Sequence, residues 1–161
     1  MTGRLVLGTL GAIAGALLGA LAWGAITAAT GFQIGYMAVG VGFLAGYGMR
    51  TLGGGRDAAD GLIAGVVALA GCIVGNLLAM IMTVAKHEHQ PMAETVGIAL
   101  FVFGNPAVAY KLLTATFNIM DVLFYAIAIY AGYRTAMKPP AAAIDAPLPA
   151  QPAAPNETPA V

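Results

Sequence analysis

The chain has 161 residues, with seven basic and seven acidic side chains that cancel to a formal net charge of zero; 9% of its residues are charged and 60% are hydrophobic. Soluble domains carry about 25% charged residues, so this composition excludes a soluble enzyme, a nucleic-acid-binding protein and a disordered regulator. A single cysteine excludes a disulfide framework and a multi-cysteine metal cluster. We therefore expect an integral membrane protein.

A helix of about 20 residues is needed to cross the hydrocarbon core of a bilayer. Four apolar runs of the chain have this length or come close to it. They cover residues 5–26, 32–49, 61–85 and 119–137, and the second is short enough to stand upright. An N-terminal signal peptide is the alternative for the first run, because Arg4 precedes it. That run is longer than the roughly 7–15 apolar residues of a signal peptide, which favours a retained helix.

The stretch between the third and fourth runs is ambiguous, because it is apolar at 96–103 and then interrupted by glycine, Asn105 and Pro106. Asparagine is a favoured helix cap and proline is tolerated at the first helical position, so a helix is predicted over 106–118. One face of that helix carries the residues Ala107, Lys111, Thr114 and Asn118. The pattern predicts an amphipathic helix at the membrane interface, with a re-entrant pair of half-helices as the alternative.

The C-terminal segment 139–161 differs sharply from the rest of the chain. It holds seven of the nine prolines and none of the 22 glycines, and it consists largely of alanine and proline. Such a segment has no apolar periodicity from which to build a core, so we expect a disordered tail. The sequence thus predicts an all-α membrane protein, with a four-helix transmembrane domain over 1–138 followed by this tail.

The basic residues predict the orientation of the chain in the membrane. If it crosses four times, five basic residues share the side that carries both termini: Arg4, Arg50, Arg56, Arg134 and Lys138. Only Lys86 and Lys111 fall on the other side. By the positive-inside rule, both termini are expected in the cytoplasm.

Small residues recur at helical spacing in the first and third runs. The residues that we expect to form a helix-packing seam are Gly8, Gly15, Gly19, Gly61, Gly65, Gly75 and the adjacent Asn76. Helices in lipid gain little from the hydrophobic effect when they associate, so close backbone approach must supply the association energy. Packing within one chain is the favoured interpretation, and a dimer interface is the alternative.

The segment after the third run combines residues that can bind metals. His87, His89 and Met92 lie close together in the sequence, and imidazole and thioether groups suit copper or zinc. Two histidines without further ligands are also typical of a polar connector in the headgroup layer. The sequence therefore predicts no bound metal, with these three residues as the weak candidates.

No other motif forms a complete site. Residues 105–108 read Asn-Pro-Ala-Val and resemble the asparagine–proline–alanine signature of aquaporins, but a second copy is missing and the chain is too short for six spans. The chain has no serine, and Cys72 has no histidine nearby in the sequence. We therefore expect no catalytic residue and no cofactor.

Two segments, 30–42 and 121–133, resemble uncharacterised small bacterial membrane proteins. Those proteins often join a four-span region to an N-terminal zinc ribbon, which this chain lacks. The resemblance implies a multi-pass protein of the bacterial inner membrane, and it transfers no activity.

Together these features predict a non-enzymatic scaffold or accessory subunit of a membrane complex. Its expected partners are the lipid bilayer and either another membrane protein or further copies of the chain, and not a nucleic acid. A small transporter or channel component that uses Asn76, Lys111 or Asp121 is the alternative, and a metal-handling protein is a weaker one.

Overall fold

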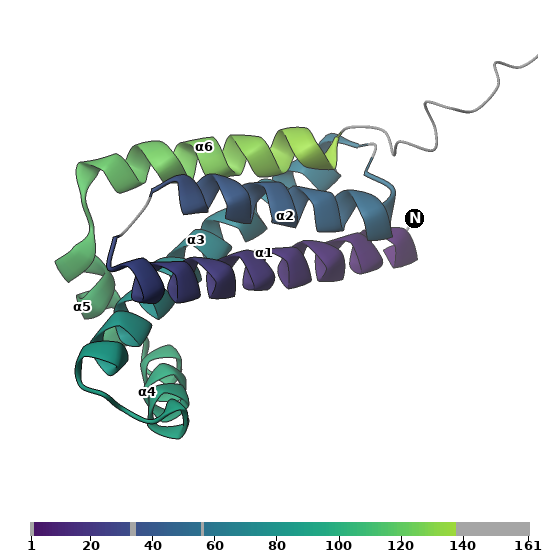
Figure 1. Ribbon diagram of the computed structural model, residues 1–161. Helices are drawn as coiled ribbons and strands as arrows, with labels where there is room; N and C mark the ends of the chain where they lie inside the picture. Colours follow the sequence, from purple (N-terminus) through teal and green to yellow (C-terminus); the bar gives the residue numbers. More distant parts are fainter. Residues whose placement is uncertain (1, 33–34, 56, 138–161) are drawn as a thin grey trace, which may run out of the picture.

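The computed structural model describes residues 2–32, 35–55 and 57–137, and this part of the chain is all-helical (Figure 1). The helices are α1 (Thr2–Thr30), α2 (Tyr36–Gly53), α3 (Ala58–His87), α4 (Met92–Gly104), α5 (Pro106–Thr116) and α6 (Ile119–Ala136). The all-α prediction is confirmed. The predicted tail at 139–161 lies outside the described residues.

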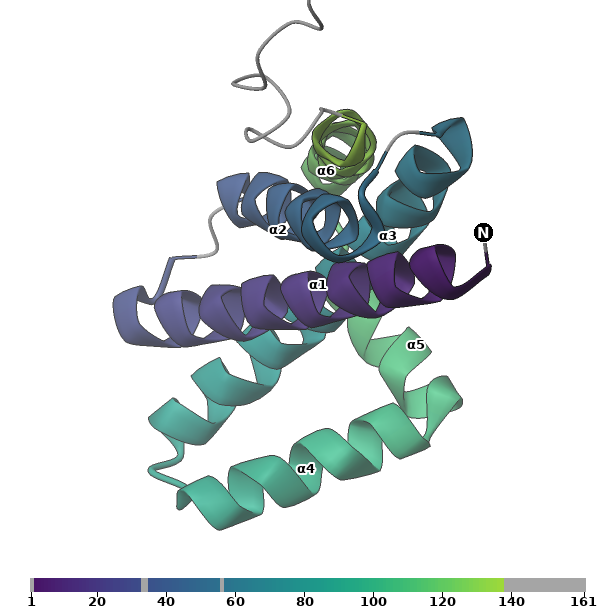
Figure 2. The same cartoon turned by 90° about the vertical axis from the view of Figure 1, so that its right-hand side faces the viewer.

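Four of the helices, α1, α2, α3 and α6, pack side by side, and the chain reverses direction from each to the next in this bundle (Figures 1 and 2). The start of α1 and the end of α6 lie at one end of the bundle, which we call the terminal end. The helices α4 and α5 project from the opposite end, which we call the elbow end. In Figure 2, α6 is viewed along its axis whereas α4 lies across the view, so α4 is crosswise to α6.

Two glycines explain why α2 is displaced along the sequence from the predicted run at 32–49. Gly31 adopts a left-handed conformation, with φ of 73°, and its N–H donates to the carbonyl of Thr27, which ends α1. Gly54, with φ of 80°, ends α2 in the same way. Hydropathy alone placed the end of this run at residue 49, four residues before α2 ends, because it does not register the stop signal at Gly54.

The helix α4 departs from the favoured prediction of one helix between the third and fourth runs, whereas the alternative contained a pair of half-helices. The structure has two, α4 and α5, bent by 101° at the break between them. The predicted start at Pro106 is confirmed. The 13 residues of α4 are apolar on almost every face, so they lack the periodicity by which an amphipathic helix is recognised.

Two of the helices, α1 and α3, are long and apolar enough to cross a membrane unaided, and α4 with α5 would count as a third, broken span. The helices α2 and α6, at 18 residues each, do not pass this test among the described residues. The chain is thus consistent with a membrane protein that has two or three apolar spans.

Seven threonine hydroxyls donate to the carbonyl four residues earlier, which satisfies them within their own helices: Thr9, Thr30, Thr51, Thr83, Thr95, Thr114 and Thr116.

Glycines bring α1 and α2 into backbone contact. A Cβ atom added at Gly11 would collide with the carbonyl oxygen of Gly48, and one at Gly15 would collide with that of Leu44. Near the terminal end, a Cβ atom at Gly8 would lie 2.9 Å from the Cα atom of Gly53. No larger residue fits at these positions without moving a helix.

The same kind of contact joins α2 to α6. Cβ atoms at Gly42 and Gly46 would collide with the carbonyl oxygens of Ala128 and Gly132, respectively. Within α2, Gly48 therefore packs against α1, whereas Gly42 and Gly46 pack against α6.

The expected seam residues are divided among three helix pairs. Gly8, Gly15 and Gly19 face α2. A Cβ atom at Gly61 or Gly65 would meet Tyr133 or Ile129 of α6, and one at Gly75 would meet Trp23 of α1 at 2.8 Å. The helices α1 and α3 do pack together, but Gly15 and Gly65 do not take part in that contact.

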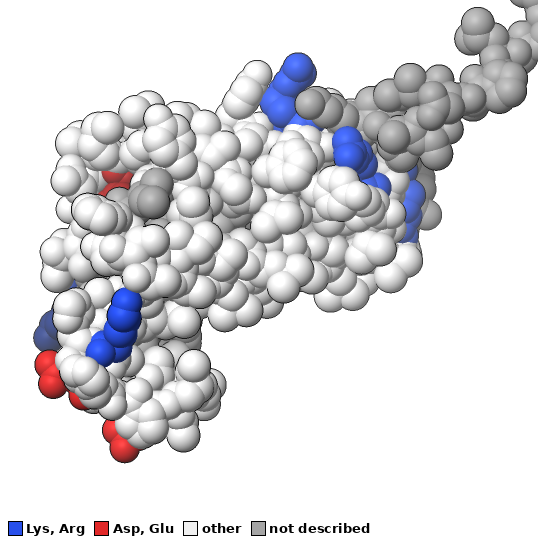
Figure 3. All heavy atoms as spheres, viewed as in Figure 1, with Lys and Arg blue, Asp and Glu red and all other residues white. Residues whose placement is uncertain are grey.

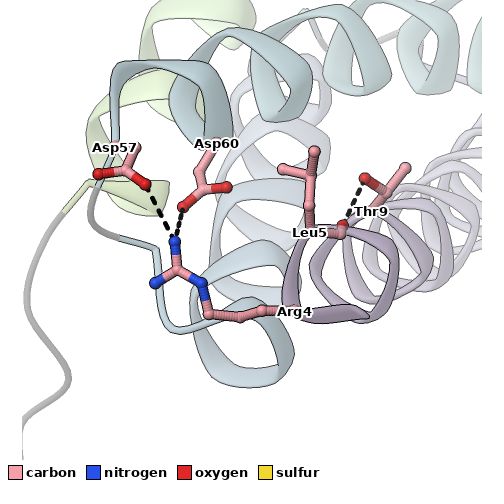
Figure 4. A network of polar contacts seen from close by, with 5 residues as sticks. All are labelled: Arg4, Leu5, Thr9, Asp57 and Asp60. Carbon is pink, nitrogen blue, oxygen red and sulfur yellow. Dashed lines mark hydrogen bonds and ion pairs between the residues drawn. The ribbon is translucent and has the colours of Figure 1, made fainter. Parts of the chain in front are cut away.

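An ion-pair cluster joins α1 to the start of α3 at the terminal end (Figure 4). The Arg4 guanidinium lies 3.0 Å from the carboxylate of Asp57 and 3.6 Å from that of Asp60. The Asp60 side chain is only 2% exposed, whereas Arg4 and Asp57 remain partly open to solvent. The buried carboxylate thus has a cation beside it, which offsets the cost of its burial.

We expect Gly15→Leu to destabilise the folded chain by about 1–3 kcal/mol, because the new side chain must push α1 away from the backbone of α2. The matched control is Ala14→Leu, since Ala14 is exposed on the opposite side of α1. Thermal unfolding in mild detergent would measure both variants beside the parent. Equal stability of the two variants would contradict the packing argument. Loss of an oligomer with an intact monomer would place the seam between chains.

Candidate functional site

The charged side chains of the described residues gather at the two ends of the molecule. Those at the terminal end are Arg4, Arg50, Asp57, Asp60 and Arg134, and those at the elbow end are Lys86, Glu88, Glu94, Lys111 and Asp121. The face shown in Figure 3 is uncharged between them. This is the distribution expected of a chain whose middle lies in hydrocarbon.

The bundle interior near the elbow end contains polar atoms that lack partners. The Nε1–H of Trp23 and the hydroxyl of Thr27, one turn apart on α1, have no hydrogen-bond partner among the described residues. Both residues are buried, with Trp23 only 1% exposed. Because buried polar groups are nearly always paired, two unpaired groups one turn apart indicate a place where water or a ligand binds.

A cavity of about 180 Å³ lies beside Trp23, between the end of α1, the start of α2 and the start of α6. Its lining residues are Trp23, Gly35, Asn118, Met120, Asp121 and Phe124. The ring of Phe124 occupies the space where a Cβ atom of residue 35 would stand, so a larger residue there would have to displace this ring. The lining therefore combines aromatic rings, an amide and one carboxylate.

A capping box fixes the carboxylate of Asp121 in the cavity wall. The backbone N–H of Asn118 donates to Asp121 Oδ2 at 2.8 Å, and the Asn118 side chain accepts from the N–H of Met120 at 3.4 Å. Asp121 is thus a first-turn acid of α6, as the sequence predicts. Because the box uses one of its two carboxylate oxygens, the other is left to face a ligand.

Asn76 lies on the inner side of this region. It is 2% exposed, and its side chain lies beside Tyr125 on α6. The neighbouring Cys72 is fully buried, and its thiol points toward the carbonyl of Ala38 on α2, with 3.7 Å between the sulfur and the oxygen. Helices α3 and α6 therefore each contribute a polar side chain to the interior at this level.

The predicted histidine and methionine segment lies elsewhere at the elbow end. His87 is the last residue of α3, His89 follows with φ of 53°, and both are exposed. Met92 begins α4 and is 71% exposed. No group of three or more metal-ligating His, Cys, Asp or Glu side chains occurs in the part of the chain that the structure describes.

Lys86 and Asn105 each cap the end of a preceding helix. The Lys86 ammonium donates to the carbonyls of Ala28 and Ala29, at 2.7 and 3.1 Å, and so caps α1. Asn105 stands at the predicted cap position of α5, but its side chain donates instead to the carbonyl of Phe101 in α4. Both contacts satisfy backbone carbonyls that a helix end would leave open.

Sequence reasoning missed the roles of Trp23 and Tyr125, whose side chains are buried in the bundle interior. The spacing of Trp23 and Thr27, one turn apart in an otherwise apolar helix, was the available signal.

Comparison with known proteins finds no matching family model, no matching curated protein and no matching solved structure. The functional argument therefore rests on the geometry of the chain itself. That geometry offers two features at the elbow end, the polar cavity and the projecting helix α4.

We expect the double change His87→Ala and His89→Ala to leave stability within about 0.5 kcal/mol of the parent, because both side chains are exposed. Thermal unfolding and elemental analysis of the purified protein would test this together. Stoichiometric copper or zinc that disappears with the double change would show that the segment binds metal.

Proposed function

We propose that this chain is a non-enzymatic scaffold or accessory subunit of a membrane complex, and that α4 is the surface that engages another membrane protein. The observation that carries the proposal is the exposure of α4. Within this apolar helix only Val102 is buried, while Leu100 is 70% exposed and Phe101 is 60% exposed. A helix that is apolar all round belongs in an apolar environment.

The rest of the chain does not cover the apolar surface of α4. Among the described helices, α4 contacts only α3 and α5, which adjoin it in sequence. Its Gly97 has no heavy atom near the position of an added Cβ atom. Glycine costs a helix roughly 1 kcal/mol relative to alanine, and no contact within the chain explains that cost here. With Ala93 one turn earlier, Gly97 leaves room for the close approach of a helix from another protein.

The same proposal includes four membrane-spanning helices and cytoplasmic termini. The supporting observation is that α2 and α6 pack along α1 and α3 in one bundle, so they share whatever environment the two longer helices occupy. The described arginines, Arg4, Arg50 and Arg134, lie at the terminal end. An excess of positive charge at that end favours its placement in the cytoplasm, and the resemblance to small bacterial proteins favours an inner membrane.

A small transporter is the second candidate, favoured by the polar side chains of Trp23, Asn76 and Tyr125 inside the bundle. Toward the terminal end, however, the interior is filled by Met49 and by small alanines, and the backbones of α1 and α2 touch at Gly11 and Gly48. The polar region is therefore confined to one end, which fits a binding pocket better than a passage.

A reporter domain fused after residue 138 should be active only in the cytoplasm, because four crossings return the C-terminal side to the side of the N-terminus. A fusion within the segment between α3 and α4, after Gln90, should report the opposite side. Equal reports from the two fusions would contradict the four-span arrangement.

A second experiment tests the partner surface with two glycines that are open in this chain. Gly97 on α4 and Gly40 on α2 both have no heavy atom within 4 Å of an added Cβ atom, so leucine fits at either position without internal strain. Affinity purification in mild detergent should recover a reproducible membrane-protein partner with the parent and with Gly40→Leu. Gly97→Leu should reduce that recovery at least about tenfold, because it fills the space left for a partner helix.

Two outcomes would contradict the accessory role. The first is that Gly97→Leu and Gly40→Leu recover the same partner equally well. The second is that the parent purifies alone as a homo-oligomer, which would favour the transporter candidate.

A further inference from the structure

We propose that the cavity lined by Trp23 and Asp121 binds a primary ammonium group that carries an oxygen acceptor a few bonds away, as in a phosphoethanolamine group. This inference concerns the wall between α1 and α6 and goes beyond the partner surface on α4. It rests on the charge, the aromatic lining and the unpaired donor of the cavity.

The charge of the cavity selects a cation. Asp121 is the one charged residue among those that line it, and no lysine or arginine is among them. Its Oδ2 atom accepts the N–H of Asn118, and its Oδ1 atom accepts no hydrogen bond from the described residues. A carboxylate oxygen in this state binds an ammonium donor strongly and disfavours a ligand whose only charge is negative.

The aromatic lining strengthens the same preference. Trp23 and Phe124 both contribute to the cavity wall. Tyr36 meets the ring of Phe124 in an edge-to-face arrangement, with 5.6 Å between the ring centroids, and so helps to fix its orientation. The face of an aromatic ring attracts a cation, most strongly where water is partly excluded.

The unpaired indole adds a second requirement. Trp23 is 1% exposed, and its Nε1–H is a donor without a partner among the described residues. An ammonium group cannot satisfy it, because ammonium has no acceptor. The ligand must therefore bring an oxygen atom as well as a positive nitrogen. At about 180 Å³, the cavity is smaller than the roughly 300–1,000 Å³ of drug-binding pockets, so the bound group is small.

Ethanolamine and its phosphate ester meet these requirements, since an ammonium and an oxygen are separated by two carbons. Two sources share this chemistry, namely the headgroup of a phosphatidylethanolamine lipid and free phosphoethanolamine. The cavity lies at the elbow end, where the charged residues Lys86 and Glu88 also lie, and this is the level at which lipid headgroups are found in a spanning bundle.

The chain provides its own reporter for the test, because Trp23 is its single tryptophan. The full-length protein in mild detergent would be titrated with phosphoethanolamine and, separately, with short-chain phosphatidylethanolamine and phosphatidylglycerol. We expect a saturable change of Trp23 fluorescence with an ethanolamine compound and a much weaker response to phosphatidylglycerol, which lacks the ammonium. A response to the lipid alone identifies the lipid headgroup as the ligand, and a response to the free compound identifies the soluble source.

The decisive variant is Asp121→Asn, which removes the charge and keeps an oxygen for the capping box. It should weaken binding at least about tenfold, as expected for the loss of a charged hydrogen bond. Glu94→Gln is the matched control, because it removes an exposed acid at the same end but outside the cavity, and its affinity should equal that of the parent. Trp23→Phe keeps a ring and loses the donor, and its weaker binding would be measured by native mass spectrometry.

Three results would overturn the proposal: no saturable response, an equal response to phosphatidylglycerol, or full affinity in folded Asp121→Asn. If that variant does not fold, the preference of the unaltered protein for ethanolamine over glycerol headgroups decides the question. These outcomes do not depend on whether α4 binds a partner, since Gly97 lies outside the cavity.

Discussion

The structure depends on helix backbones that touch where glycines leave no side chain between them. The central element is α2, which meets α1 at Gly48 and meets α6 at Gly42 and Gly46. In lipid, apolar side chains gain little by leaving their surroundings, so dispersion between closely fitted backbones has to hold the helices together. Such contacts tolerate no added atom, and this makes the bundle rigid over the length of α2.

Much of this fold could be predicted from hydropathy, because the long apolar runs that became α1 and α3 are distinctive in any sequence. The spacing of Gly8, Gly15 and Gly19 also identifies the packed face of α1. Spacing cannot reveal which helix a face meets, however, and Gly65 proved to face α6 rather than α1. One helix rather than two was favoured between the third and fourth runs for a related reason, since a segment that is apolar on most sides has little periodic signal. The cavity is lined by residues that are far apart in the sequence, and hydropathy does not predict which distant residues come into contact.

The two ends of the bundle differ in whether their buried polar groups have partners within the chain. At the terminal end the buried carboxylate of Asp60 has Arg4 beside it, and the chain itself supplies the compensating charge. At the elbow end the indole of Trp23 and the hydroxyl of Thr27 are also buried, but no described residue pairs with them. An unpaired buried donor costs about 1–3 kcal/mol, so a fold tends to retain such groups where something outside the chain completes them. This asymmetry favours the elbow end as the place where a ligand binds.

The cavity and the projecting helices are also joined covalently and by packing. Between the end of α5 and the start of α6 there are only two residues, Phe117 and Asn118. The ring of Phe117 meets that of Tyr125 edge to face, at 6.1 Å between centroids, and Asn118 forms the capping box with Asp121. The Phe117–Tyr125 ring contact and the capping box therefore fix the end of α5 to the start of α6. The same two-residue connection also forms part of the cavity wall, because Asn118 lines the cavity beside the Asp121 carboxylate.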